Sequence, residues 1–292
     1  MTPPTLTPLE SHGRRGRLLS IEPLTPESFA PFGTAISSPF PDTLNNVPAK
    51  VPEPLHSPHQ PTAVFANQNS ALKTSPVSKF VDNYPVRSSS SPADGAAARS
   101  RPQMSMFSCF PRNLSGVGMI DTSSSSSSST TTSSRPGQKK RQQLAFEVSV
   151  LERHPYTTQT FSPLGLSSEA SRGQSTPTTV FLVIVAPSLS SSSASAKSET
   201  GQDVEIQNPP DLSRLRAFVA TGGQAVTYGP GTWHAPMAVI GRRRVDFVVT
   251  QFVNGVADDD CQEVLLGDNA VGVDLGALDL DLQASDHTRA ML

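Results

Sequence analysis

The chain has 292 residues, of which 27 are proline and only 16% are charged. With its long Ser/Thr tracts, part of it has too little apolar surface to offset the entropy of ordering, so we expect one globular domain of about 160–200 residues with disordered insertions. The net charge of −2 gives no electrostatic reason to expect nucleic acid or an anionic membrane as a partner. No apolar stretch approaches the roughly 18 residues of a membrane span.

The termini and the cysteines indicate where the protein works. Residues 1–20 contain three arginines but no apolar segment behind them, which argues against a secretory signal and predicts a flexible N-terminus. Cys109 and Cys261 show neither zinc spacing nor a disulfide framework, as suits a reducing compartment. The cytosol is the predicted location.

A single domain is predicted over residues 21–266, and it opens with a short helix. Thr25 is a good N-cap, Pro26 suits the first helical position, and Gly33 would end the helix. Three Ser-rich stretches, at 88–101, 121–140 and 188–202, are predicted to be flexible insertions. Residues 267–292 are acidic and Gly-rich, and they form either a tail or a terminal strand.

The segments between the insertions predict strands. Apolar residues alternate with polar ones between Leu144 and Val150, as in a half-buried strand. The β-branched run in Thr178–Ala186 predicts a strand buried on both faces. Residues 215–220 and 224–228 flank Gly222-Gly223, which predicts a hairpin, and a further strand is expected at Arg244–Phe252. Such closely spaced strands favour a mainly β sandwich or barrel.

Two segments carry chemistry-bearing side chains, Leu151–Phe161 and Gly223–His234. In the second, a Pro-Gly turn followed by His234 resembles the second motif of the cupin barrel. The first departs from the corresponding cupin motif, because it keeps His154 but has Tyr156 and Gln159 where a second His and a Glu would stand. A three-His-plus-carboxylate cage cannot be assembled from these residues, so no firm metal site is predicted, although His154 and His234 could hold a divalent ion weakly.

Four motifs in order resemble the ureidoglycolate lyase family. They are Leu151–Phe161, Pro210–Phe218, Tyr228–Met237 and Val245–Phe247, supported by Leu24–Gly33 and Asn67–Lys73 near the start. The resemblance implies a cupin-like β-barrel of the double-stranded β-helix (jelly-roll) type with a few short helices, acting as a homodimer. It also implies cleavage of (S)-ureidoglycolate to glyoxylate and urea in allantoin catabolism, with no cofactor required.

Under this resemblance the reaction assigns roles to particular side chains. His154 and His234 would supply base and acid, with the order left open, because imidazole titrates near neutrality. The substrate carboxylate needs a cation, and the candidates are Arg153, Arg112 and Lys73. Gln159 and Thr157 could bind the ureido group, and Tyr228 and Trp233 could form the pocket wall.

Two of these residues could instead have a purely structural role. Trp233 could be a packing residue, and Arg153 could form a surface ion pair with Glu152. Two other functions also stay open. One is a ureidoglycolate amidohydrolase that releases ammonia, and the other is a non-enzymatic cupin-like regulator that binds a metabolite.

Overall fold

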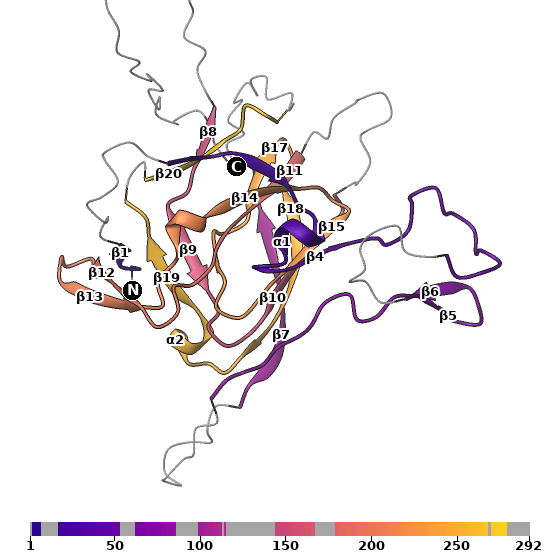
Figure 1. Ribbon diagram of the computed structural model, residues 1–292, viewed down its shortest axis with the longest axis horizontal. Coiled ribbons are helices and arrows are strands. Elements are labelled where there is room, and N and C mark those ends of the chain that lie inside the picture. The colour runs from indigo at the N-terminus through magenta and orange to yellow at the C-terminus, as the bar shows by residue number, and fades with distance from the viewer. Residues whose placement is uncertain are drawn as a thin grey trace, which may run out of the picture.

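The computed structural model describes residues 2–6, 17–52, 62–85, 99–112, 114, 144–166, 179–267 and 270–278. In this part of the chain the fold is mainly β, with short helical turns, as expected (Figure 1). The predicted insertion at 121–140 and most of 88–101 lie outside the described residues. No helix within the described ranges is long and apolar enough to cross a membrane.

The larger sheet has the order β13-β12-β1-β19-β9-β16-β11-β14-β3, and β17 also pairs with β11. Its strands are β1 (Thr5–Leu6), β3 (Ile21–Pro23), β9 (Val150–Arg153), β11 (Thr179–Ala186), β12 (Ser193–Lys197), β13 (Asp203–Gln207), β14 (Arg216–Ala220), β16 (Trp233–His234), β17 (Ala238–Gly241) and β19 (Gln262–Leu265).

The second sheet has the order β4-β15-β10-β18-β7. Its strands are β4 (Gly33–Ser37), β7 (Arg101–Cys109), β10 (Gln159–Leu164), β15 (Gln224–Tyr228) and β18 (Val245–Val253). Three more strands form the order β2-β20-β8, namely β2 (Arg17–Leu19), β8 (Ala145–Glu147) and β20 (Val271–Asp274).

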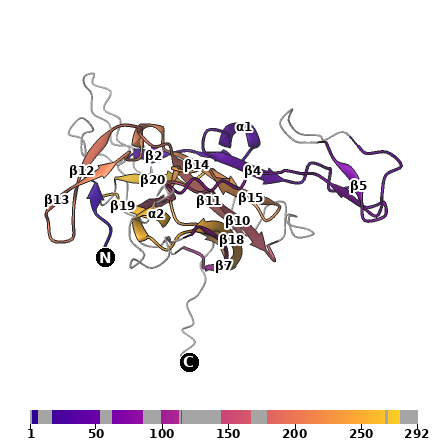
Figure 2. The same ribbon diagram turned by 90° about the horizontal axis from the view of Figure 1, so that it is seen from below.

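A two-stranded hairpin stands apart from this body. It consists of β5 (Val64–Ala66) and β6 (Ala71–Lys73), which pair with each other alone among the described strands. Both views show it at the end of an arm that projects away from the sheets (Figures 1 and 2). The turn between the strands uses left-handed backbone at Asn67, Gln68 and Asn69.

The central strand β11 divides the core into two layers. Every residue of β11 is buried, as the sequence predicts for a strand covered on both faces. Its Val180, Leu182 and Ile184 belong to one apolar cluster, and its Phe181 and Val183 belong to the other. The second cluster fills the space between the two main sheets, with Phe161, Val226 and Phe247 from the five-stranded sheet. This double burial is the main hydrophobic stabilisation of the fold.

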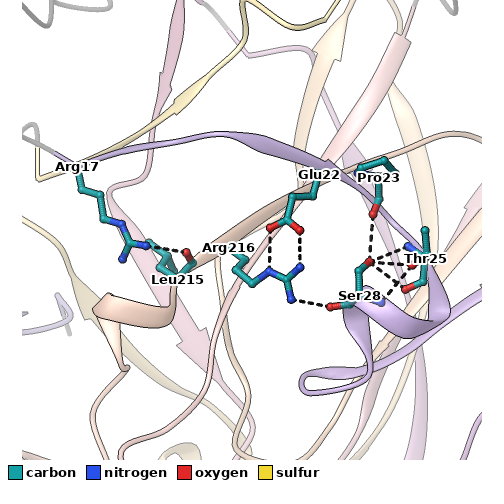
Figure 3. Close-up of polar contacts among 7 residues, drawn as sticks. All are labelled: Arg17, Glu22, Pro23, Thr25, Ser28, Leu215 and Arg216. Atoms are coloured by element: carbon teal, nitrogen blue, oxygen red, sulfur yellow. Dashed lines mark hydrogen bonds and ion pairs between the residues drawn. The ribbon is translucent and has the colours of Figure 1, made fainter. Parts of the chain in front are cut away.

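The predicted first helix is present as α1 (Pro26–Phe29). Thr25 and Ser28 form a reciprocal capping box, and Phe29 is fully buried against Phe218. Arg216 of β14 anchors this corner, because its guanidinium forms a forked ion pair with Glu22 and also donates to the Ser28 carbonyl (Figure 3).

Two expected strand arrangements are wrong. Gly222-Gly223 does not close a hairpin, because β14 pairs with β11 and β3 while β15 pairs with β10 and β4. The turn instead carries the chain from one sheet to the other. The strand expected at Leu144–Val150 is split into β8 and β9, which belong to different sheets.

The stretch 188–202 was expected to be a flexible insertion, but it contains β12. This strand pairs with β13 along its whole length and buries Ala196 completely. Its serines fit a strand because they alternate with small apolar residues. The C-terminal alternatives are resolved for Val271–Asp274, which form the terminal strand β20.

Two short helical turns complete the described structure, η1 (Leu212–Arg214) and α2 (Ala257–Asp260). The first precedes β14, and the second links β18 to β19. In α2 the amide of Cys261 donates to the Ala257 carbonyl at 2.8 Å, while the last carbonyl, that of Asp260, projects beyond the helix end.

Candidate active site

The alternation of side chains along β9 and the residue that follows it places a carboxylate and an imidazole on one face. Successive strand residues point to opposite sides, so Glu152 and His154 share a side, and Leu151 and Arg153 share the other. On β16, His234 is the register partner of Glu152, which brings its side chain to the same place. Strand geometry alone therefore gathers one carboxylate and two imidazoles.

The two imidazoles lie close together in a buried setting. Their ring centroids are 5.6 Å apart, and the side chains of His154 and His234 are 6% and 1% exposed. They lie at the end of the apolar layer between the two main sheets, where Tyr228 contributes to the packing. The structure thus brings the two sequence-predicted histidines into one site.

The hydrogen bonds of His154 define its protonation. Its Nδ1 lies 2.5 Å from the carbonyl oxygen of Asp260, which can only accept, so Nδ1 carries the proton. Its Nε2 is buried and has no hydrogen-bond partner among the described residues. Burial and the neighbouring His234 lower the pKa of His154, outweighing the opposite effects of the Asp260 carbonyl, Glu152 and the side chain of Gln159. His154 is therefore a neutral base with a free lone pair.

His234 is hydrogen-bonded in the opposite sense. Its Nδ1 lies 3.1 Å from the Thr232 carbonyl oxygen, and its Nε2 lies 3.3 Å from Glu152 Oε1 and 3.2 Å from Gln159 Oε1. Both ring nitrogens thus face oxygen atoms that can accept a hydrogen bond, and Nε2 is the nitrogen that faces the side chains of Glu152 and Gln159. His234 is suited to donate a proton where His154 is suited to accept one.

Glu152 is a site residue that the sequence reasoning did not assign to the reaction. Burial raises the pKa of its carboxyl, but the hydrogen bond from His234 and the electrostatic interactions with the two imidazoles outweigh burial and lower it overall. Glu152 is therefore an anion next to His234. Its spacing of two residues from His154 on a predicted strand was the available signal.

Gln159 and Tyr228 close the site from the second sheet. They are register partners on β10 and β15, and Gln159 also pairs with Gln251 on β18. Gln159 Nε2 donates to Gln251 Oε1 at 2.6 Å, which points Gln159 Oε1 towards His234. The hydroxyl of Tyr228 is buried without a hydrogen-bond partner in the described structure, and burial raises its pKa.

Arg153 lies on the other face of β9, away from the imidazoles. Its guanidinium donates to Gln262 Oε1, Ser188 Oγ and the carbonyls of Gln207 and Asn208, over distances of 2.6–3.1 Å. The group also lies 4.7 Å from the centre of the Trp233 ring. It therefore does not form the surface ion pair with Glu152 considered above, and it ties the β12–β13 hairpin to β9.

Trp233 and Thr157 are buried beside the site but face other partners. Trp233 packs into the apolar cluster on the far side of β11 and donates from Nε1 to the Asn208 carbonyl at 3.0 Å. Thr157 forms an antiparallel bridge with Asp82, which follows the arm. Trp233 is therefore a packing residue. Thr157 lies three residues after His154, where the chain contacts the segment that returns from the arm.

The other two expected cations are not linked to the imidazoles by any hydrogen bond or ion pair among the described residues. Arg112 Nη2 donates to the Met237 carbonyl at 3.3 Å, and its guanidinium lies 5.9 Å from the Phe146 ring centre. Lys73 ends β6 on the projecting arm (Figure 1). Neither position contributes to the cluster of Glu152, His154 and His234.

The same cluster offers a donor set for a divalent cation. One ligand atom each from Glu152, His154 and His234 lie within 4.8 Å of one another. Two imidazoles and a carboxylate are the ligands of many catalytic zinc sites, and His154 Nε2 is free to bind. When bound, such an ion would polarise a substrate oxygen.

Comparison with known proteins shows which family this chain belongs to. The model of the family described as ureidoglycolate lyase matches residues 16–273. A Schizosaccharomyces pombe protein named ureidoglycolate lyase is 31% identical over 239 residues, covering 82% of this chain and 86% of that protein. A Saccharomyces cerevisiae protein of the same name is 33% identical over 229 residues, covering 78% and 82%. A Burkholderia mallei protein of that name is 33% identical over 106 residues, covering 36% and 44%. The chain belongs to the ureidoglycolate lyase family.

Proposed function

We propose that this protein is a ureidoglycolate lyase, which cleaves (S)-ureidoglycolate to glyoxylate and urea. The observation that carries the proposal is the pairing of two buried imidazoles with complementary hydrogen bonding. His154 presents a free lone pair, and His234 faces oxygen acceptors from both nitrogens, with ring centroids 5.6 Å apart. Elimination from a hemiaminal needs one group to accept a proton and another to donate one.

The substrate carbon carries a hydroxyl, a carboxylate and a ureido nitrogen. In the proposed reaction His154 Nε2 accepts the hydroxyl proton, the oxygen's electron pair forms the carbonyl of glyoxylate, and the C–N bond breaks. His234 then donates a proton to the departing nitrogen, so urea leaves as a neutral molecule. After the reaction His154 holds one proton more and His234 one proton fewer than before. Proton exchange with water restores both groups. Atoms and charge balance without an added water or oxidant.

The neighbouring groups support this assignment of base and acid. Glu152 holds a negative charge, and its Oε1 lies 3.3 Å from His234 Nε2, where it can accept a hydrogen bond from that nitrogen and orient it as a donor. The Tyr228 hydroxyl and the Gln159 amide could bind the ureido group, because the hydroxyl has no hydrogen-bond partner among the described residues and the amide is fixed in orientation by Gln251. Of the three cations expected to bind the carboxylate, Arg153 is engaged elsewhere, and Arg112 and Lys73 remain proposals.

The decisive assay follows urea and ammonia released from ureidoglycolate by the purified protein. The proposal expects one urea per glyoxylate and no ammonia, and it expects the variant His154→Ala to lose about 10²–10⁴-fold in turnover. Ammonia release would instead identify an amidohydrolase, and binding without turnover would identify a metabolite-binding regulator.

Repeating the assay after treatment with a chelator tests whether the cluster of Glu152, His154 and His234 is a metal site. No loss of turnover is expected if the imidazoles act without a metal ion.

We also propose that the active form is a homodimer, with β7 as the contact. This nine-residue strand lies at the edge of its sheet and pairs with β18 alone among the described strands. Met104 and Met106, on one face, are 72% and 56% exposed, and Phe107, on the other, is 47% exposed. An exposed apolar edge strand is a template for pairing, and antiparallel pairing with its own copy closes the assembly by two-fold symmetry.

Sedimentation of the purified protein tests the homodimer. The wild type should sediment as a dimer, and Met106→Lys should shift it towards the monomer because the charge would be buried beside the partner strand. A matched change on a paired strand away from this edge, Ser195→Lys on β12, should leave the dimer intact. A wild-type monomer would overturn the proposal. The two free cysteines fit the cytosol as the proposed location.

A further inference from the structure

The segment that returns from the projecting arm, Val81–Tyr84, is hydrogen-bonded to residues 156–158, which closely follow His154. The Thr158 amide donates to the Val81 carbonyl at 3.2 Å, and the Val81 amide donates to Thr158 Oγ1 at 3.0 Å. The Asn83 amide donates to the Tyr156 carbonyl at 3.0 Å. A segment about 70 residues upstream in the chain therefore forms part of the wall around the proposed base.

Tyr84 continues from this segment to α2. Its hydroxyl donates to Asp260 Oδ1 at 2.5 Å, with the Phe252 carbonyl oxygen as a longer neighbour at 3.2 Å. Its ring lies 5.7 Å from that of Tyr156, so the ring position is fixed by packing as well. A tyrosine has one hydroxyl proton, and the charged carboxylate at the shorter distance is the stronger acceptor.

The Asp260 carboxylate collects three donors. Oδ1 accepts from Tyr84 and from the Asn254 amide at 2.8 Å, and Oδ2 accepts from the Gly255 amide at 2.8 Å. The main chain of the same residue is held by its amide, which donates to the Val256 carbonyl at 2.8 Å. A residue fixed at both its side chain and its amide has little freedom to turn its carbonyl.

That carbonyl is the acceptor that receives the Nδ1 proton of His154 at 2.5 Å. A neutral imidazole carries its proton on one of its two nitrogens, and the hydrogen bonds that these nitrogens make decide which one. If the Asp260 carbonyl turned away, the proton could move to Nε2, and the nitrogen that faces the substrate would lose its lone pair. The direction of this carbonyl thus decides whether His154 can act as a base.

We infer that Tyr84 is a positioning residue, which holds the Asp260 peptide and through it the Nδ1-protonated tautomer of His154. The inference rests on the proposed role of His154 as base. It goes beyond that role by assigning a function to the segment that returns from the arm. Tyr84 does not touch the imidazole, so its effect must pass through Asp260.

The conservative variant Tyr84→Phe keeps the ring and removes the hydroxyl. Loss of one charge-assisted hydrogen bond predicts about a 10-fold lower kcat, with KM changed less than 2-fold, because the residue positions the base and does not contact substrate. The matched variant Tyr156→Phe keeps the neighbouring ring and should leave both constants unchanged. Equal losses in the two variants, or a rise in KM alone, would overturn the inference.

Two further measurements separate positioning from a general structural effect. In a His154→Ala background, adding Tyr84→Phe should cost less than 2-fold, because the residue through which it acts is gone; a full 10-fold loss would contradict the relay. Nitrogen-15 spectra of the imidazoles should show Nδ1–H at His154 in the wild type and a mixture of tautomers in Tyr84→Phe. An unchanged tautomer would also refute the relay, and this readout stands whether or not the protein cleaves ureidoglycolate.

Discussion

The ring of Tyr228 lies parallel to the imidazole of His234, with centroids 3.9 Å apart and 13° between the ring planes. The two residues come from different sheets, β15 and β16, so the stack is a contact across the interface of the two main layers. It fixes the plane of His234, while the hydrogen bonds of its two nitrogens fix the rotation within that plane. An imidazole held in this way loses little entropy when it donates a proton.

Changes at Tyr228 should separate the ring from its hydroxyl. Tyr228→Phe keeps the stack and removes a buried hydroxyl that has no hydrogen-bond partner in the described structure, so the free energy of unfolding should not fall. A drop in kcat/KM would then report contact with substrate. Tyr228→Leu loses the stack and should cost about 1–3 kcal/mol of stability together with activity. Urea denaturation and steady-state assays provide both numbers, and equal behaviour of the two variants would contradict the role of the ring.

Glu152 should matter through the charge that it places beside His234. Glu152→Gln keeps the shape and an acceptor oxygen but removes the negative charge that lies 3.3 Å from His234 Nε2, so turnover should fall by about 10–100-fold. The matched control is Glu263→Gln, since Glu263 is the register partner of Glu152 on β19 and is exposed. The control should retain wild-type turnover. If both variants lose activity alike, the effect comes from general electrostatics and not from the contact with His234.

Part of the site was predicted from the sequence with the help of a family resemblance. The Pro-Gly turn before His234 and the strand before His154 pointed to strand ends, and the resemblance to the ureidoglycolate lyase family implied that the two imidazoles act together; both do lie at strand ends. The alternation within β9 also contained Glu152, two residues before His154. The same alternation places Arg153 on the opposite face of the strand from His154, which is why Arg153 does not join the imidazoles although it is adjacent in sequence.

Other parts could not be read from local sequence. The turn at Gly222-Gly223 permits a hairpin, and only the pairing preferences of four other strands send β14 and β15 to different sheets. The serines of β12 look like a linker, because their order comes from β13 and from Arg153, both distant in sequence. Tyr84 has no local signal of its role, because its link to Asp260 spans 176 positions of the chain.

Arg153 should be a stability residue. Five hydrogen bonds hold its buried guanidinium, and its removal takes one donor from the Gln207 carbonyl and one from the Asn208 carbonyl, which keeps only its hydrogen bond from Trp233. Arg153→Met should therefore lower the free energy of unfolding by about 3–5 kcal/mol, and Arg153→Lys should rescue it only in part, because an ammonium cannot reproduce the fork. KM for ureidoglycolate should stay within 2-fold of wild type for the folded fraction. A large rise in KM with unchanged stability would return Arg153 to the role of carboxylate ligand.

The protein should become less stable as the solution is acidified from neutral pH. The pKa of His154 is lowered below its ordinary value of 6.5 in the folded state, so between pH 6.5 and that lower pKa the unfolded chain binds a proton that the folded chain does not. The free energy of unfolding therefore falls as the pH drops through this window. Glu152, whose pKa is lowered from 4.5, adds a second loss of stability below about pH 4.5, because its charged form is the one that the folded state favours.

Urea denaturation at pH 7.5, 6.5 and 5.5 measures the change in the free energy of unfolding with pH that is attributed to His154. His154→Gln should flatten that slope, since glutamine does not titrate, and an equally steep slope in this variant would show that another group is responsible.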